Sequence, residues 1–170
     1  HYAEAPPVCE SDCVVDWSSP SKTYAADAVA HEAKRLISSS TKPLFLYYAL
    51  PTPHEPLSAP PSAQYDDRLQ GRRRAFGAIA ARQDAKIGSV VKSLKDNAMW
   101  PSTLMIVLSD NGAAAAGGSN YPLRGAKGGV WEGGVRTRAL MSGPLIPKNV
   151  RGSSYKGLFH AADWMPTILS

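Results

Sequence analysis

The chain has 170 residues, 44% of them hydrophobic and 19% charged, and this balance predicts a folded globular domain with its own core. The formal net charge is +5, but the basic residues are dispersed apart from three arginines at 72–74. Because no RNA-binding, zinc-finger or helix-turn-helix motif accompanies them, the sequence argues against nucleic-acid binding. No apolar run approaches the roughly 18 residues that a membrane span requires.

The first 22 residues are expected to form a loop, because prolines and serines recur in them. Cys9 and Cys13 are the only cysteines, and one pair is weak support for a metal site. A short disulfide and pairing with a cysteine outside the chain both remain open, and either would favour a secretory compartment. The sequence starts without methionine and stops where a helical pattern begins, so we expect a piece of a longer protein.

Two segments have the periodicity of amphipathic helices. Apolar residues recur at intervals of three and four after Thr23, which would suit the N-cap, as far as the serines at 38–40. The same spacing over residues 74–97 predicts the longest helix. A further helix is expected to start near the end of the chain, where Pro166 suits a first turn.

Three segments are expected to be strands: residues 44–50, 103–109 and 135–143. The first two are continuous apolar runs, which is typical of strands buried on both faces, and the third would lie nearer an edge. Helices alternating with such strands predict an α/β fold, with a mostly parallel central sheet flanked by helices. Such sheets bind ligands at the carboxyl ends of their strands, and polar residues follow the first two strands here.

Asp110 and Asn111 stand at the end of the second expected strand. A carboxylate and a side-chain amide are oxygen ligands of the kind that Ca²⁺ and Mg²⁺ prefer. The sequence Asp-Asn-Gly is also typical of a simple turn, and two ligands do not complete a metal site. Both interpretations therefore remain open from the residues alone.

Lys127 lies among glycines in the loop that follows. It could meet an anion as a point charge in a pocket lined by backbone, or it could be a surface lysine of a flexible loop. A phosphate-binding P-loop is excluded because its motif is absent. In the same loop Trp131 is expected to anchor the core, and Glu132 to bind backbone amides or a cation such as Arg136.

His54 follows the first expected strand by four residues and stands among prolines at 51, 53 and 56. The prolines restrict the local backbone, so the imidazole would be presented in few orientations. Histidine can exchange a proton near neutral pH, which makes His54 a candidate acid. A structural histidine and a proline-rich ligand segment are the alternatives.

Taken in order, five segments resemble one family. They are "PLFLYYALPTPHEPLSAP", "RQDAKIGSVVKSLKD", "LMIVLSDNG", "GGSNYPLRGAKGGVWEGGVR" and "HAADWMPTIL". Together they resemble the middle-to-late part of a type I sulfatase, in the alkaline-phosphatase-like superfamily. They are most similar to its arylsulfatase B (N-acetylgalactosamine-4-sulfatase) branch. The resemblance runs from about Cys13 to the end of the chain.

The resemblance implies Ca²⁺-dependent hydrolysis of sulfate esters, on a sulfated small molecule or on a sulfated carbohydrate such as a glycosaminoglycan. In this family a formylglycine made from the cysteine of a C-x-P-S-R motif is the nucleophile. By resemblance Asp110 and Asn111 are calcium ligands and Lys127 contacts the sulfate. His54 would contact the sulfate near the bridging oxygen and is a candidate acid for the leaving alcohol. The family also implies a secreted, periplasmic or lysosomal location.

The chain departs from the family's pattern in one decisive way. Neither Cys9 nor Cys13 is followed by x-P-S-R, so the nucleophile is not in this chain. We expect residues 1–170 to be a partial sulfatase catalytic domain that lacks the N-terminal nucleophile segment and the C-terminal subdomain, and to be inactive alone. A phosphoesterase of the same superfamily and a truncated, non-catalytic binding or structural module are the alternatives.

Overall fold

The structure is a computed structural model and describes residues 24–58, 66–115 and 117–170. The chain divides into two compact units, His1–Val90 and Val91–Ser170. The cysteines Cys9 and Cys13 and the expected N-cap Thr23 lie outside the described residues.

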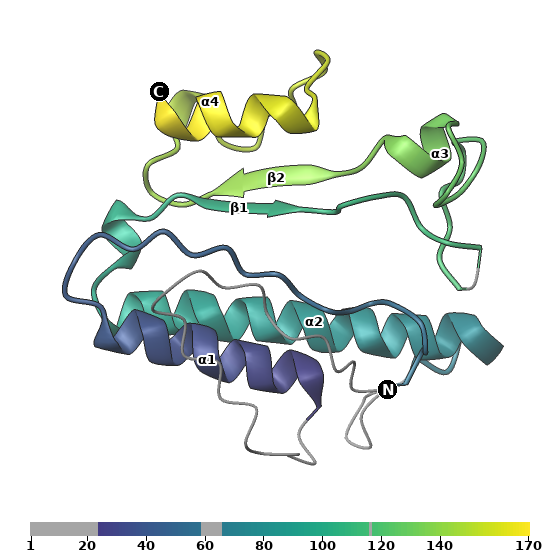
Figure 1. Ribbon diagram of the computed structural model, residues 1–170, viewed down its shortest axis with the longest axis horizontal. Helices are drawn as coiled ribbons and strands as arrows, with labels where there is room; N and C mark the ends of the chain where they lie inside the picture. Colours follow the sequence, from purple (N-terminus) through teal and green to yellow (C-terminus); the bar gives the residue numbers. More distant parts are fainter. Residues whose placement is uncertain (1–23, 59–65, 116) are drawn as a thin grey trace, which may run out of the picture. The chain divides into compact units, whose positions relative to one another are not determined.

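The first unit begins with helix α1, Ala25–Ser39, which confirms the helix predicted after residue 23 (Figure 1). The N-cap is Tyr24, whose side chain makes no capping hydrogen bond. Asp27 stands in the first turn, where a negative charge is favourable to the helix dipole. The buried face of α1 is made of three alanines and an isoleucine, namely Ala26, Ala30, Ala33 and Ile37.

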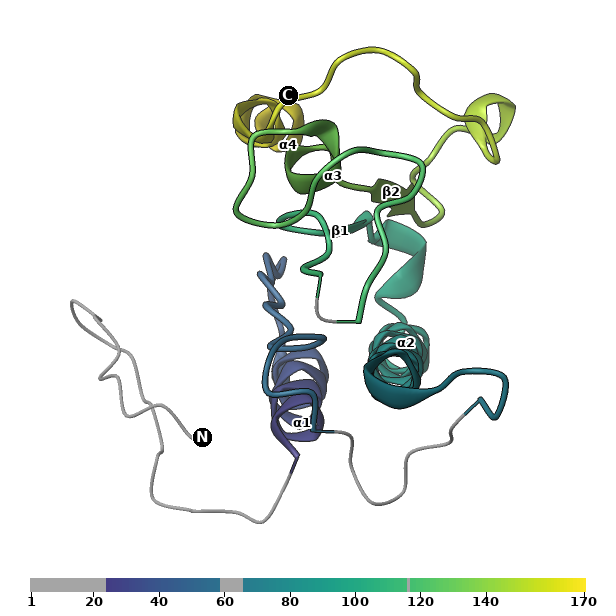
Figure 2. The same cartoon turned by 90° about the vertical axis from the view of Figure 1, so that its right-hand side faces the viewer.

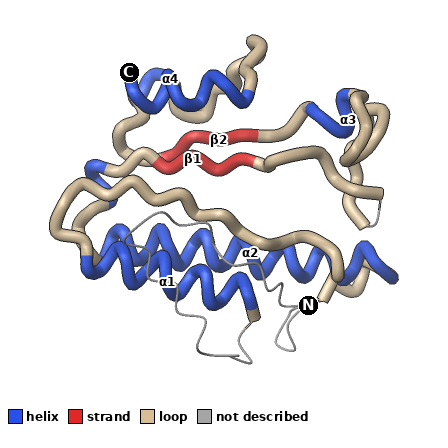
Figure 3. Tube along the Cα trace, in the orientation of Figure 1, coloured by secondary structure: helices blue, strands red, loops and turns tan. Residues whose placement is uncertain are grey.

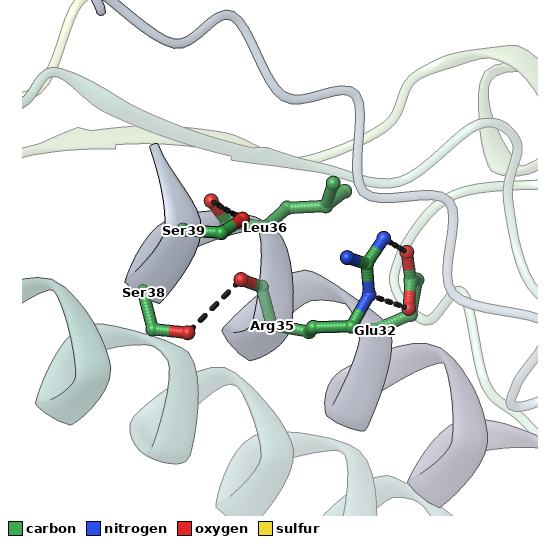
Figure 4. Close-up of polar contacts among 5 residues, drawn as sticks. All are labelled: Glu32, Arg35, Leu36, Ser38 and Ser39. Carbon is green, nitrogen blue, oxygen red and sulfur yellow. Dashed lines mark hydrogen bonds and ion pairs between the residues drawn. The ribbon is translucent and has the colours of Figure 1, made fainter. Parts of the chain in front are cut away.

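The exposed face of α1 carries its own polar contacts (Figure 4). The guanidinium of Arg35 binds Glu32 through both carboxylate oxygens, at 2.8 and 2.5 Å. The hydrogen bond from Arg35 holds the pKa of Glu32 below its ordinary value. In the last turn, Ser38 Oγ donates to the Arg35 carbonyl at 3.0 Å. Ser39 Oγ donates to the Leu36 carbonyl at 3.4 Å, which is one of the carbonyls that a helix end leaves without a partner N–H.

Helix α2, Gly71–Asp96, confirms the long helix and begins three residues earlier than expected. It lies beside α1 in both views of the ribbon (Figures 1 and 2). Its buried residues within the first unit are Ala78, Ile79 and Val90. The buried residues of both helices are alanines and branched apolar residues, and Ile37 and Ile79 are the largest of the fully buried side chains.

One carboxylate ties α1 to α2. Asp27 Oδ2 lies 2.6 Å from Arg82 Nη2, and Asp27 Oδ1 lies 2.7 Å from Lys86 Nζ. Burial by itself raises the pKa of Asp27, but hydrogen bonds from Arg82 and Lys86 outweigh it and hold the pKa below its ordinary value. The three side chains are only 21–29% exposed, so solvent screens this cluster less than the ion pairs on the surface.

The prediction of a buried strand at residues 44–50 is wrong. This segment has no regular secondary structure and is drawn as loop in Figure 3. Phe45 and Tyr47 are 77% and 83% exposed, whereas Leu46 and Tyr48 are half-buried. A strand requires hydrogen bonds to a neighbouring strand, and the described residues of the first unit offer none.

The second unit contains the sheet. Strand β1, Met105–Leu108, and strand β2, Ala139–Ser142, confirm the strands expected at 103–109 and 135–143, although both are shorter. They pair antiparallel, from Met105 opposite Ser142 to Leu108 opposite Ala139. In the described part of the chain this is a two-stranded sheet, so the combination of helices and sheet is confirmed and the mostly parallel arrangement is not.

The expectation that the strand at 103–109 is buried on both faces is also wrong. The residues of β1 are half-buried, and its last residue, Leu108, is 49% exposed. In β2 three of four residues are exposed, which agrees better with the expected edge position. The apolar composition of β1 indicates a strand correctly, but burial also requires a neighbouring layer of side chains.

Two short helices complete the second unit. Helix α3, Glu132–Val135, is a single turn just before β2. Helix α4, Trp164–Leu169, confirms the helix expected around Pro166 and follows a 3₁₀ turn, Ala161–Asp163. His160 caps this turn: its backbone N–H donates to Asp163 Oδ2 at 2.6 Å, and its Nδ1 accepts from the Ala162 N–H. Among the described residues, no helix is long and apolar enough to cross a membrane.

Candidate active site

The turn after β1 places Asp110 and Asn111 at the end of the sheet. Ser109 N–H donates to the Arg138 carbonyl at 3.1 Å, so the pairing with the other strand continues one residue past β1. Asn111 N–H donates to Asp110 Oδ1 at 2.9 Å, and Ser109 Oγ donates to the Asn111 carbonyl at 2.8 Å. Asp110 is exposed and Asn111 half-buried. The carboxylate is thus oriented by its own turn.

Close approach of backbones explains two glycines of this region. Gly112 N–H donates to the Gly134 carbonyl at 2.9 Å. A Cβ on Gly112 would lie only 1.8 Å from the Gly133 carbonyl oxygen, and a Cβ on Gly133 would lie 2.3 Å from that of Gly125. Any side chain at Gly112 or Gly133 would therefore push these segments apart.

Lys127 returns to the residues that follow Asp110 and Asn111. Its backbone N–H donates to the Ala113 carbonyl at 3.2 Å, across a loop of fourteen sequence positions from Ala113. Gly125 and Gly128, on either side, have φ angles of +89° and +88°, a conformation that suits glycine. The side chain of Lys127 is exposed. The structure therefore brings the backbone of Lys127 next to the Asp110–Asn111 segment.

Asn120 and Arg124 lie in the same loop and were not predicted from the sequence. Asn120 hydrogen-bonds the backbone of Ala113 and Gly125. The Arg124 guanidinium lies 3.8 Å from the centroid of the Trp131 ring, a cation–π arrangement. Trp131 is 51% exposed, so the expectation that it anchors the core is wrong. The expected pairing of Glu132 with Arg136 is confirmed, at 3.1 Å.

His54 belongs to the first unit and is exposed. Its Nδ1 lies 2.9 Å from the Glu55 carbonyl oxygen. A carbonyl can only accept, so the hydrogen of this bond lies on Nδ1. The carboxylate of Glu55 accepts from the Leu57 N–H at 3.2 Å and also binds the Arg72 guanidinium at the start of α2. The His54 loop is thereby fastened to a long helix.

Asp110 and Asn111 are the type of ligand that calcium binds, but two ligands are too few to complete its coordination shell. They offer a carboxylate and an amide oxygen, whereas Ca²⁺ takes six to eight oxygen ligands. Within the described ranges, no group of three or more histidine, cysteine, aspartate or glutamate side chains could hold a metal. These two residues can therefore supply one side of a calcium shell.

The chain resembles curated sulfatases over most of its length. Arylsulfatase J from Mus musculus is 36% identical over 180 residues, covering 100% of this chain and 30% of that protein. Arylsulfatase A from Homo sapiens is 33% identical over 145 residues, covering 83% and 27%. N-acetylgalactosamine-6-sulfatase from Mus musculus is 34% identical over 104 residues, covering 58% and 19%. The chain thus spans less than a third of the length of each relative.

A solved structure shares the fold. It is the crystal structure of Ps i-CgsB in complex with k-i-k-neocarrahexaose, which aligns with a TM-score of 0.63 and 30% sequence identity. The alignment covers 72% of this chain and 28% of that one. The family model described as Sulfatase matches residues 3–170. Since this match takes in the His54 loop, the Asp110–Asn111 turn and the Lys127 loop, the chain belongs to the sulfatase family.

Proposed function

We propose that this chain carries part of the active site of a Ca²⁺-dependent sulfuric ester hydrolase. The observation that supports this most is the 3.2 Å hydrogen bond from Lys127 N–H to the Ala113 carbonyl, three residues after Asp110. It returns a cationic residue to a segment that carries two oxygen donors. A sulfate group can use both partners, because its oxygens can bind a metal ion and a lysine ammonium at the same time.

The roles of the residues follow from their chemistry. Bound calcium would polarise the sulfate oxygens and offset their charge. Asp110 and Asn111 would hold the ion from one side through their side-chain oxygens. Lys127 would bind the sulfate as a point charge and stabilise the negative charge that develops in the transition state. The nucleophile, by family resemblance a formylglycine, is not in this chain.

His54 would complete the reaction by protonating the leaving alcohol. The hydrogen bond from Nδ1–H to the Glu55 carbonyl orients the ring and leaves the proton exchange to Nε2. In its charged form Nε2–H can donate to the bridging oxygen as the bond to sulfur breaks. The ion pair between Glu55 and Arg72 fastens the loop that carries this ring.

A sulfated carbohydrate is the substrate class that we propose. One relative is named as an N-acetylgalactosamine-6-sulfatase, and the solved relative was crystallised with a neocarrahexaose. From the family resemblance, a location in the secretory pathway is also part of the proposal. The proposal includes the fold that the sequence predicts for the full-length protein, in which residues 1–170 form part of a catalytic domain built on a mostly parallel sheet.

Two alternatives lead to different experiments. A phosphoesterase of the same superfamily would use similar metal ligands, and a non-catalytic module would keep the fold without turnover. The gene sequence upstream of His1 distinguishes them: C-x-P-S-R supports a sulfatase, and a serine or threonine nucleophile supports a phosphoesterase.

The direct test is turnover by the full-length gene product. We expect hydrolysis of 4-nitrophenyl sulfate in preference to 4-nitrophenyl phosphate, and a loss of about 10²-fold or more in kcat for Lys127→Ala. The isolated 170-residue chain should show no turnover above its own Lys127→Ala control. Preference for the phosphate ester would favour the phosphoesterase, and no turnover of either ester would favour the binding module.

A further inference from the structure

The side chain of Asn120 bridges two separate backbone segments of the second unit. Its Oδ1 accepts from Ala113 N–H at 2.8 Å, while its Nδ2 donates to the Ala113 carbonyl at 2.8 Å and to the Gly125 carbonyl at 3.1 Å. One half-buried amide thus satisfies three backbone groups. On Ala113 it occupies the N–H and the carbonyl together, as a neighbouring strand would.

The two segments are those that carry the candidate site. Ala113 follows Asp110 and Asn111 within the turn, and Gly125 precedes Lys127 by two positions. The Ala113 carbonyl accepts from Lys127 N–H as well, so the turn and the Lys127 loop meet at this single residue. A glycine-rich loop has many conformations to lose, so a side chain that fixes both of its ends matters here.

The bonding pattern specifies asparagine. One group must accept from an N–H and donate to two carbonyls, and a side-chain amide does both in a planar group. Rotating the amide by 180° would set its oxygen against two carbonyl oxygens, so the orientation of Asn120 follows from its partners. Aspartate has the same shape but would keep only the bond from Ala113 N–H and would repel both carbonyls.

We propose that Asn120 is a positioning residue that fixes Lys127 relative to Asp110 and Asn111. This inference rests on the proposed function, because it assigns to Asn120 an effect that acts through Lys127. Asn120 itself need not touch the sulfate. Loss of its bonds would leave Lys127 on a looser loop, and displacement of a binding group by about 1 Å can lower turnover about 10²-fold.

The test is a double-mutant cycle in the full-length gene product, with 4-nitrophenyl sulfate as the probe. We expect Asn120→Asp to lower kcat/KM about 10-fold to 100-fold in the natural background. In the Lys127→Ala background the same change should cost about twofold or less, because the group that it positions is gone. A calorimetric titration with inorganic sulfate should show weakened binding for Asn120→Asp, which gives a readout independent of turnover.

Asn97→Asp is the matched control. Asn97 also donates its side-chain amide to a backbone carbonyl, that of Ser93 at 2.9 Å, so the substitution removes one such bond and adds the same charge. It should change neither kcat/KM nor sulfate affinity. Asn120→Ser, which adds no charge, replaces Asn120→Asp in the cycle if the latter does not fold, and the same non-additivity is expected.

The possible outcomes separate the two proposals. An equal cost of Asn120→Asp in both backgrounds, or no cost in either, overturns the positioning role. A Lys127→Ala variant with unchanged turnover and sulfate affinity overturns the proposed function instead. A large effect in the natural background that disappears without Lys127 supports both.

Discussion

Different kinds of interaction stabilise the inside of each of the two units. In the first, α1 and α2 bury small and branched apolar side chains and share the carboxylate of Asp27. In the second, the loop between β1 and β2 is held by backbone hydrogen bonds, by glycines in close contact and by the amide of Asn120. Packing of side chains tolerates modest change, whereas a site built from close backbones does not.

The two units are also proposed to contribute different chemistry. His54, in the first unit, would deliver a proton to the leaving alcohol, and Lys127, in the second, would stabilise charge on the sulfate. A leaving alcohol with a high pKa needs the proton more than nitrophenol does, whereas charge on the sulfate develops with either. Substrates with different leaving groups can therefore separate the two contributions.

The largest expected effect comes from His54→Ala in the full-length gene product. We expect a loss in kcat of about 10²-fold to 10⁴-fold for a poor leaving group, the range of general acid catalysis, and a smaller loss for 4-nitrophenyl sulfate. Lys127→Ala is the matched comparison and should reduce both rates by similar factors. Equal losses for both substrates in His54→Ala would remove the acid role.

A smaller effect is expected on stability, and it compares one glycine from each unit. Gly112→Ala should destabilise the protein by about 3 kcal/mol, because its Cβ would overlap the Gly133 carbonyl oxygen. Gly88→Ala, within α2 and with nothing within 4 Å of its Cβ, should instead stabilise by about 0.5–1 kcal/mol. Denaturant unfolding of the two variants measures both. If Gly112→Ala proved as stable as the natural protein, the close backbone contact would be wrong.

The smallest effect concerns the carboxylate between α1 and α2. Asp27→Asn should lower the free energy of unfolding by about 1–2 kcal/mol near neutral pH, more than a surface ion pair contributes. Asp96→Asn, which breaks an exposed pair with Lys92, is the control and should cost about 0.5 kcal/mol or less. Equal costs for the two substitutions would show that burial does not strengthen the Asp27 cluster.

The dependence on pH follows from the lowered pKa of Asp27. Because the folded pKa lies below the unfolded one, the stabilisation is present above the unfolded value of about 3.8 and is lost as pH falls through the folded pKa. The difference between natural protein and Asp27→Asn should therefore be constant near neutral pH and shrink below about pH 4. A difference that grew on acidification would contradict this sign.

The helices could be predicted from the sequence because periodicity is a local signal. The spacing of apolar residues gave α1 and α2 to within a few positions, and Pro166 indicated the start of α4. Residues 44–50 have the composition of a buried strand, but pairing and burial depend on partners that composition does not name. The parallel sheet was expected for the same reason and is not confirmed.

The candidate site was predictable only in part. The residue types of Asp110, Asn111 and Lys127 suggested metal and anion binding, yet each also fitted a simple turn or a surface loop. The prediction that they belong to one active site came from the order of motifs along the chain, which resembles that of sulfatases. Asn120 gave no signal, because one asparagine in a loop of glycine and serine resembles any turn residue until its three backbone partners are known.

The proposal depends above all on the Asp110–Asn111 turn supplying calcium ligands and not being a simple turn. Calorimetric titration of the full-length gene product with Ca²⁺, together with turnover of 4-nitrophenyl sulfate, tests it most directly. We predict that Asp110→Ala weakens Ca²⁺ binding and lowers activity together, while the exposed Asp84→Ala on α2 changes neither. Unchanged Ca²⁺ affinity in Asp110→Ala would show that the Asp110–Asn111 segment is only a turn.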